Sequence, residues 1–279
     1  MPIDYKKLIQ WHFSPLTRRY TRNESIRFAR GFGAGTGEAM RQDDAAFLDG
    51  TAALPMNAVA LADGEFWQMH PETGIDWRQI VHAEEGIVVH RPLPPEGVVV
   101  VTQSVEEIFD RGVGRGAVMV QKQLLSSEDG TPLVAISVTT ILKGDGGFGG
   151  KPYAPVKVEV PEDRAPDATI EIRTPHDDEN AVFRLSKEIA AASDVGAGKS
   201  MMRGLGCFGL AGRGILKLVC DNDPVRLRKL AVRYVGPMFT DETMQIELWH
   251  QAPGGAVFRM RSQERGALVL NNCLVEFEP

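Results

Sequence analysis

The sequence of 279 residues is poor in cysteine, and its three cysteines, Cys207, Cys220 and Cys273, lack metal-ligand spacing. An odd number of cysteines without such spacing is typical of reduced thiols, so we expect no structural disulfide. The N-terminal residues lack the apolar stretch of a signal peptide, and no apolar run approaches membrane-spanning length. The last residues do not match the peroxisomal Ser-Lys-Leu signal. We therefore expect a cytoplasmic protein that does not interact with a membrane.

An excess of positive charge is also absent. The chain has 31 Lys and Arg against 37 Asp and Glu, a net charge of -6, which argues against nucleic-acid binding. The glycine-rich run 144–150 has neither a parallel strand before it nor a helix after it, so it is not a phosphate or dinucleotide loop. Hydrophobic residues make up 43% of the chain, enough for one large domain or two smaller ones. We expect neither a metal nor a resident cofactor.

Prolines and charges are concentrated between residues 151 and 178, where large apolar residues are few. This composition is typical of an extended linker. It divides the chain into a domain at 1–150, a linker at 151–180 and a second domain at 181–279.

Each side of the linker has the same order of signals, a helix followed by β-rich runs. A capping box, Thr21 with Glu24, begins the first helix, and a short helix at 188–192 precedes a longer one at 202–219. The expected strands are 86–90, 98–108, 116–125 and 133–142, then 229–235, 243–250, 256–262 and 267–277. The pattern predicts an α+β fold with two antiparallel sheets, each wrapped around a central helix.

The longer helix is rich in glycine, at a cost of about 1 kcal/mol for each glycine relative to alanine. The glycines are Gly204, Gly206, Gly209, Gly212 and Gly214. Small residues at these positions would let a sheet approach the helix closely. A poorly formed glycine-rich loop is the alternative.

Several motifs, in order along the chain, resemble the MaoC-like (R)-specific 2-enoyl-CoA hydratases, also called hydratase 2. Phe-Arg-Leu-Ser at 183–186 resembles the family's Tyr-Arg-Leu-Ser, and Arg-Gly-Leu-Gly-Cys-Phe-Gly at 203–209 resembles His-Gly-Leu-Cys-Thr-Phe-Gly. Further matches are His82 to Glu85, Phe109 to Gly114, Gly144 to Lys151, Ala231 to Tyr234, Pro237 to Phe239 and Asp241 to Thr243. Between Lys187 and Glu188, however, the chain lacks roughly nine residues that carry the family's Asp, Asn and His.

The resemblance implies a double hotdog fold whose N-terminal half shelters the acyl chain and whose C-terminal half carries the reaction. It implies a homodimer that acts on an acyl-CoA thioester and needs no other cofactor. The implied reaction is hydration of a trans-2-enoyl-CoA to a 3-hydroxyacyl-CoA, or the reverse dehydration.

Hydration of such a thioester requires a general base, a general acid and donors to the enolate oxygen. In the family the Asp and His of the absent segment take the first two roles, and a backbone N–H at the start of the buried helix takes the third. The resemblance places that donor at Gly204, beside Arg203, which replaces the family's His. Glu188 is the remaining catalytic candidate. Close packing at Gly204 and a solvated helical position for Glu188 are the alternatives.

The substrate-binding residues that we predict are His82, Ala83, Arg111, Tyr234, Arg233 and Lys229. His82 and Tyr234 match ligand-side positions of the family, although a structural His and a core Tyr would explain them as well. The cations would bind the CoA phosphates, or belong to a solvated surface. Two further positions depart from the family pattern, since Ala83 replaces a Gly and Glu85 replaces a Gln.

The missing segment leaves three interpretations open. In the first interpretation, the sequence lacks a segment that the natural protein contains, so the natural protein is an intact hydratase, and sequencing the coding DNA decides this. Alternatively, the protein is a silent acyl-CoA-binding hotdog or the non-catalytic subunit of an active hydratase, as the changes at Ala83, Glu85 and Arg203 favour. In the third interpretation Arg203 and Glu188 catalyse a different reaction on a related ligand.

Overall fold

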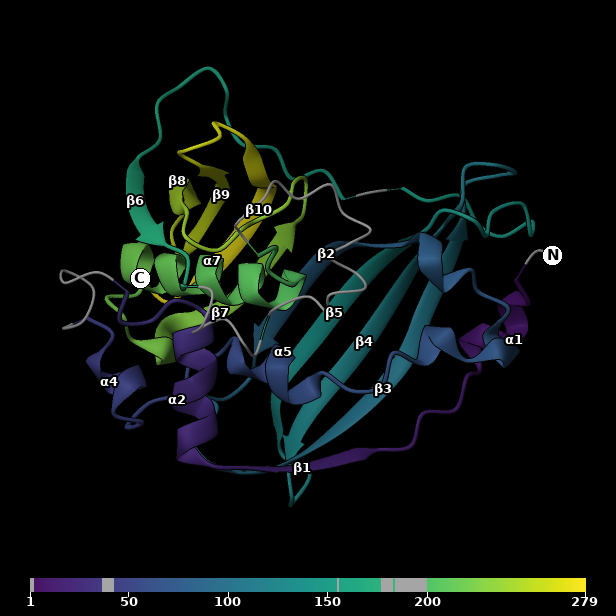
Figure 1. The fold of residues 1–279 in the computed structure, drawn as a ribbon, viewed down its shortest axis with the longest axis horizontal. Helices are drawn as coiled ribbons and strands as arrows, with labels where there is room; N and C mark the ends of the chain where they lie inside the picture. Colours follow the sequence, from purple (N-terminus) through teal and green to yellow (C-terminus); the bar gives the residue numbers. More distant parts are fainter. Residues whose placement is uncertain (1–2, 37–42, 155, 177–182, 184–199) are drawn as a thin grey trace.

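The computed structural model describes residues 3–36, 43–154, 156–176, 183 and 200–279. Its strands form one antiparallel sheet of ten strands in the order β1-β3-β4-β5-β2-β7-β10-β9-β8-β6 (Figure 1). The predicted helix at 188–192 and the candidate Glu188 lie outside the described residues.

The N-terminal half contributes five strands and the C-terminal half the other five. The first five are β1 (Leu16–Tyr20), β2 (Ile80–Val89), β3 (Gly97–Asp110), β4 (Ala117–Ser127) and β5 (Pro132–Leu142). The others are β6 (Ala168–Arg173), β7 (Leu227–Arg233), β8 (Thr243–Ala252), β9 (Gly255–Ser262) and β10 (Leu268–Phe277). Every run predicted to be a strand is a strand, usually longer at one or both ends.

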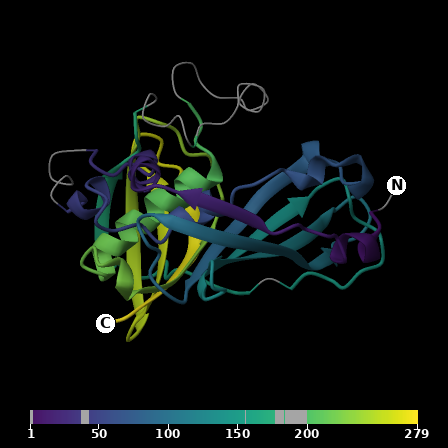
Figure 2. The ribbon, with the colours of Figure 1, turned by 90° about the horizontal axis from the view of Figure 1, so that it is seen from below.

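The helices are short except for α7 (Gly204–Val219), which lies across the C-terminal strands (Figure 1). The others are α1 (Tyr5–Ile9), α2 (Arg22–Gly31), α4 (Ala45–Leu48) and α5 (Asn57–Ala62), with 3-10 turns at Trp67–Met69, Pro71–Thr73, Trp77–Gln79 and Pro224–Arg226. Figure 2 shows the two halves side by side, with α1 at the far end of the N-terminal half from α7. No helix among the described residues is long and apolar enough to span a bilayer.

The double hotdog prediction is confirmed, with one difference in the sheet. The two sheets are continuous, because β2 pairs antiparallel with β7 from Glu84 opposite Arg233 to Val88 opposite Lys229. Residues from the two halves are therefore held in a fixed register at this junction. Helix α5 of the N-terminal half is much shorter than α7 of the C-terminal half.

The capping box that we predicted at Thr21 begins α2. The Thr21 side chain accepts from the Glu24 N–H at 3.3 Å, and the Glu24 carboxylate accepts from the Thr21 N–H at 2.8 Å. Both hydrogen bonds satisfy donors that a helix N-terminus leaves free. The hydrogen bonds that the Thr21 N–H and hydroxyl donate to the Glu24 carboxylate lower its pKa.

The glycines of α7 do permit close packing. A Cβ on Gly214 would lie 2.5 Å from Cδ1 of Ile246 on β8, so the sheet approaches the helix there as predicted. A Cβ on Gly209 would instead collide with the ring of Phe32, which follows α2. The helix therefore packs against both the C-terminal sheet and the N-terminal half.

The predicted linker, 151–180, needs correction because it contains β6. This edge strand pairs antiparallel with β8, from Ala168 opposite Leu248 to Arg173 opposite Thr243. Ile170 packs against the core and Ile172 is 1% exposed, the alternation of a half-buried strand. The prolines of the segment flank this strand, so composition over the whole segment concealed it.

A buried ion pair joins α7 to the N-terminal half. Nη1 of Arg213 lies 2.7 Å from Oδ2 of Asp44, and the two side chains are 2% and 3% exposed. Asp44 Oδ2 also accepts from the Gly35 N–H at 2.9 Å. Burial lowers the pKa of Arg213, and Asp44 opposes that shift.

The three cysteines are free and buried. Burial raises the pKa of both Cys220 and Cys273 to about 12. These thiols are therefore core residues with little thiolate character.

Candidate functional site

The N-terminus of α7, which we call the helix tip (Arg203, Gly204 and Leu205), carries free backbone donors. Arg203 is the N-cap, and its carbonyl accepts from the N–H groups of Gly206 and Cys207 at 2.9 and 3.1 Å. The N–H groups of Gly204 and Leu205 have no hydrogen-bond acceptor among the described residues. Two free donors at the positive end of a 16-residue helix favour a developing negative charge.

Two predicted ligand residues from opposite halves meet at this helix tip. A Cβ on Gly204 would lie 2.9 Å from Nδ1 of His82 and 3.3 Å from Cζ of Tyr234. The Tyr234 N–H donates to the Ala83 carbonyl at 2.9 Å, and the His82 and Tyr234 rings are 4.8 Å apart. The pairing of β2 with β7 thus brings together residues far apart in the sequence.

Glu85 adds a buried carboxylate to this site, and the sequence analysis gave it no role. It is 3% exposed, and its Oε2 accepts from the Tyr234 hydroxyl at 2.7 Å. The same oxygen lies 4.0 Å from Nε2 of His82. Burial raises the pKa of Glu85, against the lowering effects of His82 and the Tyr234 hydrogen bond. Burial and Glu85 also raise the pKa of Tyr234.

Arg203 at the helix tip is held by Asp63, a residue that the sequence did not single out. The pair is bidentate, with Nη1 to Oδ2 at 2.9 Å and Nη2 to Oδ1 at 3.1 Å. Asp63 is the C-cap of α5 and lies at the edge of a cavity of about 980 Å³. Its lining combines apolar side chains with charged ones; the apolar residues include Trp11, Phe13, Leu16, Trp67 and Val101, and the charged ones include Lys7, Arg18, Glu65 and Glu72.

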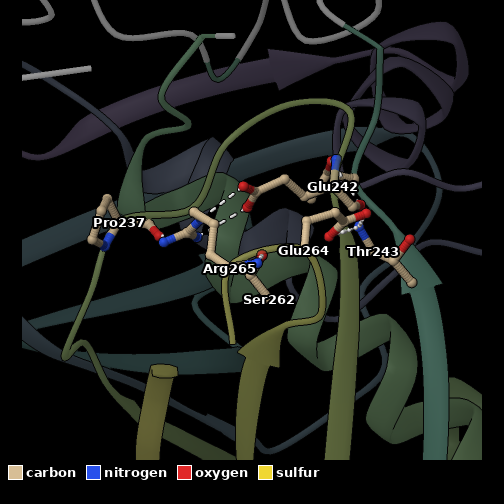
Figure 3. Close-up of polar contacts among 7 residues, drawn as sticks. Pro237, Glu242, Thr243, Ser262, Glu264 and Arg265 are labelled. Carbon is tan, nitrogen blue, oxygen red and sulfur yellow. Dashed lines mark hydrogen bonds and ion pairs between the residues drawn. The ribbon is translucent and has the colours of Figure 1, made fainter. Parts of the chain in front are cut away.

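A second ion pair fixes the segment that leads into α7 (Figure 3). Arg265 donates to both oxygens of Glu242 at 2.7 and 2.9 Å and to the Pro237 carbonyl at 2.8 Å. Residues 238–240 in turn bond to residues 200–202, through Met202 N–H to the Met238 carbonyl and Thr240 N–H to the Ser200 carbonyl, both at 2.9 Å. Arg265 therefore positions the backbone just before the helix tip.

Arg265→Lys is expected to lower the free energy of unfolding by about 1.5–3 kcal/mol, since lysine cannot make the bidentate contact to Glu242. Glu242 is 1% exposed, so water cannot replace the lost bond. Arg228→Lys is the control, because Arg228 and Glu278 form an exposed pair for which less than about 1 kcal/mol is expected. Urea denaturation measures the free energy of unfolding of both variants. Equal losses would contradict the structural role given to the Arg265–Glu242 pair.

Glu85→Gln is expected to raise the melting temperature at neutral pH. The raised pKa of Glu85 means that ionisation costs more in the folded protein, so its contribution to stability is present at low pH and is lost as pH rises. The charged and titratable groups that face it among the described residues are His82, Tyr234, Asp63, Arg203 and Cys207. Melting curves of both proteins between pH 4 and 8 test this.

The advantage of Glu85→Gln should shrink towards about pH 4, where the carboxyl is protonated in both the folded and unfolded states. A gain in stability that does not depend on pH would contradict the expected cause.

The remaining predicted cations do not converge on the helix tip. Arg233 pairs with Glu84 at 2.8 Å across the β2–β7 junction, and Lys229 pairs with Glu276 at 2.9 Å. Lys229 is four residues from Arg233 along β7, or about 13 Å. Arg111 follows β3, and β4 and β5 separate that strand from β2.

The sequence prediction of one phosphate-binding cluster thus receives no support from their placement. Within the described ranges, no three His, Cys, Asp or Glu side chains are placed to bind a metal.

The fold and the helix tip together define a double hotdog protein whose halves meet at backbone donors that no described residue accepts from. A family model, the MFE-2 hydratase 2 N-terminal domain, matches residues 19–144. The 3-hydroxyacyl-thioester dehydratase Y of Mycobacterium tuberculosis is 32% identical, and the alignment covers 88% of this chain and 87% of the dehydratase. The probable enoyl-CoA hydratase 2 of Dictyostelium discoideum is 27% identical over 100% of this chain and 98% of its own.

Solved structures show the same fold. A MaoC-like dehydratase from Phytophthora capsici superposes with a TM-score of 0.80 at 23% identity, over 98% of each chain. The peroxisomal multifunctional enzyme type 2 of Drosophila melanogaster gives a TM-score of 0.74 at 25% identity, over 95% of this chain and 48% of that one. The chain belongs to the MaoC-like hydratase 2 family.

Proposed function

We propose that this protein hydrates a trans-2-enoyl-CoA to a 3-hydroxyacyl-CoA, or catalyses the reverse dehydration. The observation that carries the proposal is the pair of N–H groups at Gly204 and Leu205, which have no acceptor within the described ranges, with His82 next to Gly204. Addition of water to C3 moves electron density onto the thioester oxygen, and free donors at a helix N-terminus stabilise that charge. Family relatives with names such as enoyl-CoA hydratase 2 and 3-hydroxyacyl-thioester dehydratase support the same reaction.

The N-terminal half is the proposed site for the acyl chain. The apolar residues of the cavity line a space that extends to Asp63, which contacts Arg203 at the helix tip. An acyl chain placed there would bury apolar surface while its thioester reaches Gly204. Arg233 and Lys229 are already paired with carboxylates, so phosphate binding would require exchange of those ion pairs.

The assay is the loss of ultraviolet absorbance when purified protein is mixed with trans-2-enoyl-CoA substrates of short, medium and long chain. The proposal expects turnover with at least one chain length. Thermal stabilisation by these thioesters without turnover would instead favour a silent acyl-CoA-binding protein, an alternative suggested by the residues missing between Lys187 and Glu188. Neither turnover nor stabilisation would reject both functions.

The proposed setting is fatty acid metabolism in the cytoplasm, with the protein as a homodimer or as the partner of an active hydratase. Some relatives carry peroxisomal names, such as the peroxisomal enoyl-CoA hydratase 2 of Arabidopsis thaliana. Light scattering after size exclusion measures the oligomeric state, and fluorescence microscopy of the tagged protein in its own cells tests the compartment.

A further inference from the structure

The chain must supply its own proton donor and acceptor if it hydrates an enoyl thioester, because the family's Asp and His are absent. Among the described residues, His82, Glu85, Tyr234, Asp63 and Arg203 are titratable side chains beside the helix tip. Asp63 and Arg203 neutralise each other in a bidentate pair. The three others form a separate cluster.

His82 lies next to Gly204 at the helix tip. A helical Cβ points towards the N-terminus of its helix, so an atom close to the Cβ position of Gly204 lies ahead of the helix tip. Nδ1 of His82 is that atom, at 2.9 Å. The side chain is 32% exposed, which leaves the ring accessible to water and ligand.

The other nitrogen of His82 faces Glu85. Nε2 is buried, has no hydrogen-bond partner among the described residues and lies 4.0 Å from Oε2 of Glu85. A shift of about 1 Å brings the two atoms within hydrogen-bond distance. Tyr234 holds Glu85 in place through its hydroxyl, at 2.7 Å, so the carboxylate has a fixed position behind the imidazole.

We propose that His82, oriented by Glu85, carries both proton transfers of the hydration, in place of the family's acid and base. This proposal rests on the function proposed above. Nδ1 takes a proton from water as the water oxygen bonds to C3, and the C2–C3 π electrons move to the thioester enolate held by the Gly204 N–H. The protonated Nδ1 then delivers that proton to C2, which yields the 3-hydroxyacyl thioester and restores neutral His82.

The carboxylate of Glu85 would give His82 both an orientation and a charge partner. Donation from Nε2 to Glu85 leaves the lone pair of Nδ1 free to accept a proton. Negative charge on Glu85 also stabilises the imidazolium formed after the first transfer, as the buried Asp does for the His of a serine protease. A Gln at position 85 could accept the same hydrogen bond but would not stabilise the charge.

The experiment compares His82→Gln and Glu85→Gln with the native protein in the absorbance assay. We expect His82→Gln to lower kcat by about 10²–10⁴-fold with KM little changed, the range for loss of a general acid–base group. His90→Gln, an exposed position just after β2, is the matched control and should keep native kcat. Circular dichroism and thermal melting establish that each variant is folded.

Glu85→Gln has a second readout that a merely structural role would not move. Its kcat should fall by about 10-fold or more while KM changes little, because glutamine keeps a hydrogen-bond acceptor but loses the charge that stabilises the imidazolium. This readout also serves if His82→Gln fails to fold.

The outcomes separate this inference from the function on which it rests. Native turnover with kcat of either His82→Gln or Glu85→Gln within threefold of native overturns the role of the pair but leaves the hydratase function standing. No turnover in the native protein, with thioester binding retained, overturns both and leaves a binding protein. A large loss of kcat in both variants, with KM little changed, supports the inference.

Discussion

Asp44→Asn is expected to lower the free energy of unfolding by about 3–5 kcal/mol, the usual cost of leaving one member of a buried ion pair without its partner. Arg213 would keep its positive charge inside a core where it is 2% exposed. Asparagine retains an acceptor of similar size, so the effect isolates the charge. The pair joins α7 to the N-terminal half, and equilibrium urea denaturation measures the loss.

Asp43→Asn is the matched control for this prediction. Asp43 pairs with Lys217, also on α7, but its side chain is 42% exposed and that of Lys217 is 29% exposed. A partly solvated pair contributes less than about 1 kcal/mol. Similar losses in the two variants would show that burial of the Arg213 pair does not determine its contribution.

Gly204→Pro is expected to lower kcat by about 10²–10³-fold, the loss measured when one donor to a developing oxyanion is removed. Proline has no N–H, yet it is well tolerated at the first position of a helix. The residue before it, Arg203, already has φ -65° and ψ 154°, the extended conformation that a following proline requires. The variant should therefore keep α7 and lose the donor.

Gly204→Ala separates loss of the donor from the added bulk. Alanine keeps the N–H but places a Cβ 2.9 Å from Nδ1 of His82, so it tests the steric effect alone. We expect its kcat to lie between those of the native protein and Gly204→Pro. Equal activity in the proline and alanine variants would argue against a role for the Gly204 N–H, whatever the size of the loss.

The strands that the sequence predicted are those with continuous β-branched and apolar residues, such as β3 and β5. β6 was hidden because it is a six-residue edge strand between prolines, and its burial depends on pairing with β8. β1 was also missed, since Arg18 and Arg19 interrupt its five residues. Short edge strands carry little local signal of their own.

The candidate site was predictable where the family motifs are specific and not where contacts cross between the halves. Gly204, His82 and Tyr234 were predicted from motif positions, and the structure brings them together. Glu85 and Asp63 gained their roles from the β2–β7 pairing and the end of α5, which spacing along the chain does not reveal.

Lys229 illustrates the opposite case, and its predicted role in phosphate binding stays a prediction. It is close to Arg233 in the sequence, but the rise of an extended strand separates the two residues by about 13 Å.

A crystal structure with a thioester that cannot be hydrated is the most direct test of the proposed site. Our account predicts the thioester oxygen at about 2.7–3.1 Å from the backbone nitrogen of Gly204, with C2 and C3 next to Nδ1 of His82. A thioester bound away from the helix tip, or side chains blocking the Gly204 N–H in the complex, would contradict it.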